Sequence, residues 1–106
     1  MADITTVDEK LDCVINTAGG TAVDVGTSST LIVSAHASTK YVLIVNNSDT
    51  VIYIRLGGAA ALNQGIRLNP NGGAYEISST INKYAGAIYG IHGGSGSKRV
   101  LVTHGW

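Results

Sequence analysis

Short apolar runs separated by glycine or polar residues dominate this chain. Residues 41–45 (Tyr-Val-Leu-Ile-Val) form a continuous apolar run, which predicts a central strand covered on both faces. Residues 51–56 alternate, so that one face carries two isoleucines and a leucine. The stretch between them, residues 46–50, consists of Asn, Ser, Asp and Thr, which favour turns. We predict a β-hairpin from these three segments.

The same reasoning extends over most of the chain, because Val, Ile, Thr and Tyr are strand formers and glycine punctuates them. Residues 74–77 alternate, with Tyr75 and Ile77 expected to point inward. In residues 69–73, proline presets φ at the second turn position, and Asn or Gly supplies the positive φ that follows. We expect further strands at residues 21–25, 30–34, 65–68, 85–91 and 98–103.

The remaining segments are expected to be irregular. Residues 59–64 form either one helical turn or a loop across an end of the sandwich. Residues 92–97 are predicted to be a flexible loop and residues 104–106 a tail. No window shows a sustained helical period. The prediction is an all-β fold, a small antiparallel β-sandwich or jelly-roll-like domain at residues 13–106, with an extended N-terminal arm at residues 1–12.

Composition narrows the functional class. Charged residues make up only 13% of the chain and the formal net charge is zero, so the basic surplus of a nucleic-acid binder is missing. A charge-poor surface suits a protein that is covered in an assembly. An ordinary small domain with a hydroxyl-rich surface remains the alternative. Cys13 is the single cysteine, which excludes an intrachain disulfide. With neither a signal peptide nor an apolar run approaching ~18 residues, we expect synthesis in the cytoplasm and no membrane partner.

Candidate chemistry is sparse. His36, His92 and His104 show no zinc-ligand spacing, and we expect them on the surface. No serine lies in a nucleophile-elbow context. The glycine- and serine-rich stretch at residues 93–98 precedes a predicted strand instead of a helix, so a hairpin loop explains it better than a phosphate site does. Tyr84 and Trp106 are the aromatic residues free to act as sugar-stacking platforms. The sequence therefore predicts no enzyme, no metal and no cofactor.

The order of strands and turns from residue 41 to residue 103 resembles a class of small β-sandwich virion proteins of tailed bacteriophages. The resemblance runs over more than half of the chain, and the matching stretches within it are residues 41–56, 57–73, 74–77, 86–91 and 99–102. The resemblance implies a non-enzymatic structural protein, foremost a capsid decoration (cement) protein. A head–tail or tail accessory protein, or a small carbohydrate-binding module, is the alternative. A small enzyme whose site the sequence does not reveal is the remaining class.

Partners follow from this resemblance and from the first residues of the chain. The implied partners are further copies of the chain, with a trimer favoured, and the major capsid protein or another virion protein. The protein is then expected in the virion, after synthesis in the host cytoplasm. The arm carries four of the seven acidic residues and only scattered apolar ones, so we expect it to order on a neighbouring subunit. A terminus without a binding role is the alternative. The residues expected to bind a partner are Ile4, Val7, Asp8, Glu9, Leu11 and Trp106.

Overall fold

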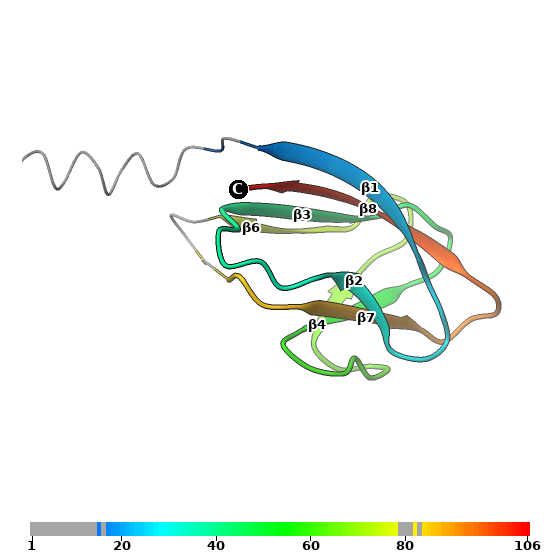
Figure 1. Ribbon diagram of the computed structural model, residues 1–106. Coiled ribbons are helices and arrows are strands. Elements are labelled where there is room, and N and C mark those ends of the chain that lie inside the picture. The colour runs from blue at the N-terminus through cyan, green and yellow to red at the C-terminus, as the bar shows by residue number, and fades with distance from the viewer. Residues whose placement is uncertain (1–14, 16, 79–81, 83) are drawn as a thin grey trace, which may run out of the picture.

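In the computed structural model, two antiparallel four-stranded sheets pack face to face (Figure 1). The structure describes residues 15, 17–78, 82 and 84–106. Its strands are β1 (Ala18–Val25), β2 (Thr30–Val33), β3 (Tyr41–Asn46), β4 (Ile52–Leu56), β5 (Ile66–Leu68), β6 (Ala74–Ser78), β7 (Ile88–His92) and β8 (Lys98–Gly105). The predicted all-β sandwich is confirmed, and within the described residues there is no helix. The predicted arm, residues 1–12, lies outside the described residues.

The strands of the first half of the chain pair with those of the second half. Sheet A has the order β1-β8-β3-β6 and sheet B the order β2-β7-β4-β5. Each strand of the first half thus pairs with its counterpart in the second half: β1 with β8, β2 with β7, β3 with β6 and β4 with β5. An eight-stranded, two-sheet arrangement of this kind is a jelly roll, as the sequence predicted.

Alternating side chains from both sheets fill the core. In β3, Val42, Ile44 and Asn46 are buried while the residues between them are half-buried. The buried apolar cluster consists of Val25, Ile32, Val42, Ile44, Ile52, Ile54, Leu68, Ile77, Ile88, Val100 and Val102. Because Ile and Val dominate this cluster, the strands that have the highest β propensity also supply the apolar burial that holds the sheets together.

The predicted hairpin of residues 41–56 is wrong. Although β3 and β4 are adjacent in sequence, β3 belongs to sheet A and β4 to sheet B. The intervening turn therefore crosses from one sheet to the other, and the two strands face each other across the core. An alternating pattern specifies which face of a strand is buried, but it does not specify which strand lies beside it.

Asn46 explains why the chain changes sheet at this point. Its side chain is fully buried. The Nδ2 group donates to the carbonyl oxygens of Thr50, at 2.8 Å, and Leu68, at 3.0 Å. Its Oδ1 atom accepts a 2.6 Å hydrogen bond from the Ser48 hydroxyl. The amide therefore ties the end of β3 both to the crossing turn and to β5 in the opposite sheet.

The second turn has the predicted backbone geometry. Asn71 has a φ of 58° and Gly72 a φ of 117°, which confirms the positive φ expected after Pro70. The amide of Asn71 donates to the carbonyl of Ser48. The crossing turn and the 69–73 turn therefore lie against each other at one end of the sandwich.

Three strands have an end that lies two or three residues from its predicted position. β1 begins at Ala18, three residues earlier than expected, β7 runs from Ile88 to His92, and β8 continues to Gly105. The predicted tail is thus wrong. Thr17 and Trp106 exchange two backbone hydrogen bonds, of 2.6 and 2.8 Å, which extend the pairing of β1 with β8 to its end.

A glycine in β7 allows the close approach that the sequence predicted for residues 85–91. Gly90 lies beneath Ile32, and a Cβ atom at this position would collide with the Ile32 Cδ1 atom. Ile32 comes from the neighbouring strand β2 and belongs to the buried cluster. The missing side chain therefore makes room for a larger core residue.

Candidate functional site

The outer face of sheet A has no covering layer in the described part of the chain. Since successive side chains of a strand point to opposite faces, the residues between the buried positions point outward. They are Ala18, Gly20, Ala22 and Asp24 of β1, Arg99, Leu101, Thr103 and Gly105 of β8, Tyr41, Leu43 and Val45 of β3, and Ala74, Glu76 and Ser78 of β6. We call this set the sheet A face.

The middle of the sheet A face is apolar. The strand register places Ala22, Leu101, Val45 and Ala74 in one row across the four strands. Leu101 is 41% exposed, one of the few large apolar side chains that are open to solvent. At the end of the face where β8 finishes, Gly105 is covered by Ile15, which precedes β1. The run at residues 41–45 is therefore covered on one face only, contrary to the prediction.

Charged side chains lie at the margins of the face. Asp24 and Arg99 form a 3.2 Å ion pair at one end, and both are more than half exposed. On the other margin the Tyr41 hydroxyl donates a 2.6 Å hydrogen bond to the Glu76 carboxylate. This hydrogen bond raises the pKa of Tyr41, with smaller contributions from burial and from the negative charge of Glu76. The apolar centre and charged rim are the usual arrangement of a protein-binding surface.

Sheet B, by contrast, carries a cover on its outer face. Residues 57–65 fold over it as a loop, without the helical turn that was one of the two expectations (Figure 1). Ala60 is buried, and its amide N–H donates a 2.9 Å hydrogen bond to the Ser29 hydroxyl. The Tyr53 hydroxyl donates to Asn63 Oδ1 of the same loop at 2.9 Å. The two outer faces therefore differ, and the sheet A face is the candidate interaction surface.

A cavity of about 240 Å³, partly open to solvent, lies between the sheets at the end where β8 finishes. It is lined by Thr21, Ile32, Val33, Ser34, His36, Thr39, Val42, Val102, His104 and Trp106. None of these side chains is a carboxylate, lysine or arginine. The walls are apolar apart from a few hydroxyl groups and the imidazoles of His36 and His104.

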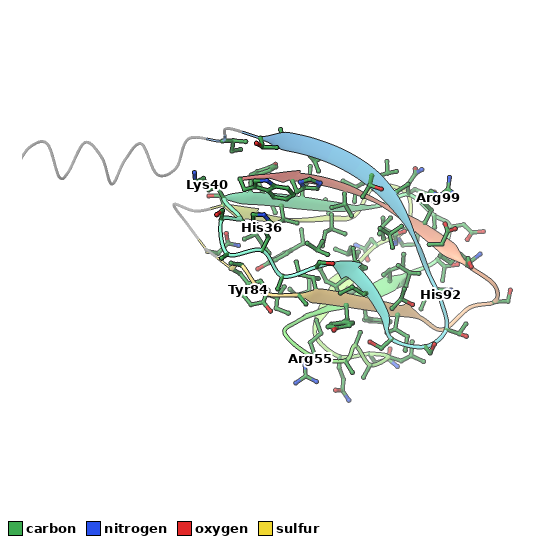
Figure 2. All side chains as sticks on the ribbon, viewed as in Figure 1. His36, Lys40, Arg55, Tyr84, His92 and Arg99 are labelled. Atoms are coloured by element: carbon green, nitrogen blue, oxygen red, sulfur yellow. The ribbon has the colours of Figure 1, made fainter. Side chains whose placement is uncertain are left out.

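Trp106 is held between two imidazole rings at the mouth of this cavity. Its ring centroid lies 4.1 Å from that of His36 and 4.4 Å from that of His104, with nearly parallel planes. Figure 2 shows His36 in the loop between β2 and β3. Both faces of the indole are therefore occupied, and Trp106 does not offer the free face that sugar stacking needs.

Tyr84, the other expected platform, is also engaged. It packs against the buried cluster, and its hydroxyl donates to the Ala87 carbonyl at 2.9 Å. Its hydroxyl oxygen also lies against Gly86, where a Cβ atom could not fit. The two aromatic residues that the sequence suggested for carbohydrate binding thus have structural roles.

One of the three histidines, His92, is not the surface residue that the sequence predicted, while His36 and His104 are half-buried. His92 is fully buried, and Figure 2 places it at the far end of β7. Its Nδ1 atom accepts the amide N–H of Gly94 at 3.1 Å, and its Nε2 atom lies 2.7 Å from the Gly96 carbonyl oxygen. Since a carbonyl only accepts, Nε2 carries the proton. His92 therefore organises the loop between β7 and β8.

The described residues contain no group of three or more His, Cys, Asp or Glu side chains placed to hold a metal ion. In the same part of the chain, no helix has the length and apolar character needed to cross a membrane. Of the residues predicted to bind a partner, Ile4, Val7, Asp8, Glu9 and Leu11 lie outside the described residues. The role of Trp106 in partner binding stays a prediction.

The sequence reasoning missed the sheet A face. Its signal was the run at residues 41–45, which was interpreted as a strand buried on both sides. An apolar residue at every position fits equally well a strand with one face in the core and the other on a binding surface. β8 gives the same signal, because the exposed Leu101 lies between the buried Val100 and Val102 and makes this stretch apolar at every position.

Comparison with known proteins adds no further assignment. No family model matches the chain, and neither a curated protein nor a solved structure is significantly similar to it. The functional argument therefore depends on the surface and the cavity themselves.

Proposed function

We propose that this protein is a non-enzymatic structural component of a tailed-bacteriophage virion, a capsid decoration protein that binds the assembled shell and stabilises it. The observation that carries the proposal is the uncovered sheet A face, with an apolar centre and charges at its margins. Such a surface gains stability by being covered by another protein. The strand-and-turn resemblance to small virion proteins of tailed phages selects the class of partner.

The mechanism of stabilisation is mass action. A protein that binds the assembled shell and not its separated subunits shifts the equilibrium toward the shell. Many copies on a repeating lattice convert weak individual contacts into avidity. Association of the copies with one another strengthens this effect, and the resemblance implies three copies at a threefold position.

The charge distribution supports a binding role for the arm. Residues 1–12 carry four carboxylates and one lysine, whereas residues 13–106 carry three carboxylates and six basic side chains. Two of these basic groups, Arg55 and Arg99, point away from the body of the domain in Figure 2. We propose that Asp8 and Glu9 contact basic groups of a neighbouring subunit, with Ile4, Val7 and Leu11 as apolar anchors.

A matched pair of leucine variants tests the binding surface. Leu101 lies on the sheet A face and is 41% exposed, while Leu62 lies on the loop that covers sheet B and is 42% exposed. Replacing either by aspartate removes a similar amount of exposed apolar surface. We expect Leu101→Asp to weaken capsid binding at least about tenfold, since it loses apolar burial and places a charge in the interface. Leu62→Asp should bind as the parent does.

The measurement is co-sedimentation of the purified protein with capsids of the phage that encodes it, together with mass spectrometry of its virions. Hundreds of copies per particle support a decoration protein, and about a dozen indicate a neck or tail component. Absence from the virion, or equal binding by the two leucine variants, would refute the proposal. Deletion of residues 2–12 tests the arm: capsid affinity should fall while the domain stays folded.

A further inference from the structure

The free edge of β1 sets this strand apart from the other strands at the margins of the two sheets. β1 is eight residues long and ends the order of sheet A. In Figure 1 it runs along the outer margin of the sheet, with β8 on its inner side. No strand of the described residues pairs with the outer edge of β1. An open edge of this length is a template for a further strand.

Two observations show which residues of β1 direct their backbone N–H and C=O groups to β8 and which direct them to the free edge. Thr17 and Trp106 exchange both of their backbone hydrogen bonds, so bonded pairs with β8 recur at every second residue from that point. On the other side of β8, the amide of Asn47 donates to the Arg99 carbonyl, so Arg99 and its alternate neighbours bond to β3. Both observations give the same alternation along β8. Ala18, Gly20, Ala22 and Asp24 therefore direct their N–H and C=O groups to the free edge.

The other edge strands are protected in ways that β1 is not. In sheet A, the Asn82 side chain covers the free edge of β6: its Oδ1 accepts the Ser78 amide at 2.8 Å, and its Nδ2 donates to the Glu76 carbonyl at 3.0 Å. In sheet B, β5 is three residues long, and β2 is four residues long with a register shift. β1 has no proline or lysine and carries one charged residue, Asp24. Natural edge strands normally use such features to prevent pairing.

We propose that β1 pairs with β1 of a second copy of this chain, antiparallel about a twofold axis at Thr21, so that the two A sheets form one continuous sheet. Identical free edges pair in this way because a twofold axis makes the same surface complementary to itself. We infer that the added strand is a second β1, because two copies of this strand fit each other in the positions of their free N–H and C=O groups, in side-chain size and in charge. This association goes beyond the proposed function and does not require a capsid.

The register follows from the four available residues. With Thr21 on the axis, Ala18 lies opposite Asp24 of the second copy and Gly20 lies opposite Ala22. All four residues then form hydrogen-bonded pairs, which gives about eight backbone hydrogen bonds across the interface. Sliding one strand by two residues reduces the four pairs to three. A Thr–Thr pair at the axis is a favourable cross-strand contact.

Charge and shape agree with this register. Each Asp24 lies opposite the small side chain of Ala18 and not opposite the other aspartate. Asp24 is already paired with Arg99 of its own chain, at 3.2 Å. The outward side chains at Ala18, Gly20 and Ala22 are small, so they do not obstruct an approaching strand. The combined sheet joins the two sheet A faces into one wider apolar surface.

The test uses the full chain and a matched pair of variants at one position. Ala22→Pro removes an N–H that points to the free edge, so it leaves the ladder between β1 and β8 intact. Ala22→Thr changes the side chain but keeps the N–H. We expect Ala22→Pro to raise the dimer dissociation constant by about a hundredfold or more, since the symmetric interface loses two hydrogen bonds and gains two ring clashes. Ala22→Thr should dimerise like the parent. Sedimentation equilibrium measures both constants.

Amide hydrogen exchange of the parent chain supplies a second readout that needs no variant. In the dimer, the amides of Ala18, Gly20, Ala22 and Asp24 should be protected, and dilution should remove this protection. A monomer at high concentration would overturn the inference. So would a trimer whose β1 edge amides exchange freely, or a dimer that Ala22→Pro leaves unchanged. Loss of the dimer on deletion of residues 2–12 would also overturn it, because the added strand would then be the arm.

Discussion

Replacing Asn46 by alanine is expected to destabilise the fold more than any surface change of the same size. The buried amide donates to the carbonyls of Thr50 and Leu68. In the variant the Ser48 hydroxyl no longer donates to Asn46 and can turn to the Thr50 carbonyl, 3.1 Å away, so losing the Asn46 bond costs about 1 kcal/mol. The Leu68 carbonyl is left buried with one donor fewer, at a further cost of about 1–3 kcal/mol. We expect a total loss of about 3 kcal/mol, a large part of the ~5–15 kcal/mol typical of such a domain.

Urea unfolding at 25 °C measures this loss, with Trp106 fluorescence and circular dichroism as the two signals. The midpoint should fall while the slope with denaturant stays unchanged. The control is Asn47→Ala at the next position, where the side chain is exposed and the backbone amide still bonds to Arg99. That change should cost less than about 0.5 kcal/mol. Equal midpoints for the two variants would show that Asn46 does not hold the crossing turn.

An isosteric variant separates the loss of hydrogen bonds from the loss of volume. Asn46→Asp keeps the shape but replaces the amide donor with a carboxyl group facing two carbonyls. Burial disfavours the charged form, so the folded state holds the proton more tightly than the unfolded chain does. The free energy of unfolding of this variant should fall furthest below that of the parent at neutral pH, and the difference should shrink as the pH falls. A deficit that does not depend on pH would contradict the assigned orientation of the amide.

Three further changes have defined outcomes. Gly90→Ala should cost about 1–3 kcal/mol, since its Cβ collides with Ile32, and adding Ile32→Val should recover part of that loss; no recovery would contradict the contact. Glu76→Gln should lower the pKa of Tyr41 toward its ordinary value in an NMR titration, and an unchanged pKa would exclude the hydrogen bond as its cause. His92→Leu should cost about 2 kcal/mol and speed amide exchange in the loop between β7 and β8; unchanged exchange would show that the imidazole does not order this loop.

The fold class was predictable because its signals are local. Each of the eight strands lies at a segment that the sequence predicted, and the positive φ after Pro70 follows from turn chemistry alone. The partner of each strand was not predictable in the same way. The pattern of residues 41–56 is identical for a hairpin and for a turn that crosses between sheets, because both bury alternate residues. What separates them is the pairing with distant segments, since β3 pairs with β6 and β8 whereas β4 pairs with β5 and β7.

The candidate site was less predictable, because it depends on what the rest of the chain leaves uncovered. The sequence shows that residues 41–45 are apolar throughout, but it does not show that a loop covers sheet B and leaves sheet A open. The burial of His92 was not predictable for a related reason. His92 follows an apolar run and precedes glycines, a context typical of an exposed loop. Its burial depends on hydrogen bonds to Gly94 and Gly96, which form only in the folded loop.

The position of β8 has a consequence for the order in which the chain folds. β8 is the last strand in sequence, yet it lies between β1 and β3 in sheet A. Until β8 is in place, β1 has no neighbour in its own sheet. The pair closest in sequence, β4 with β5, can form early, whereas the pair of β1 with β8 closes a loop that spans almost the whole domain. Contacts between such distant segments slow folding. A growing chain therefore leaves the β1 segment unpaired until β8 has been synthesised, and β8 completes sheet A late in folding.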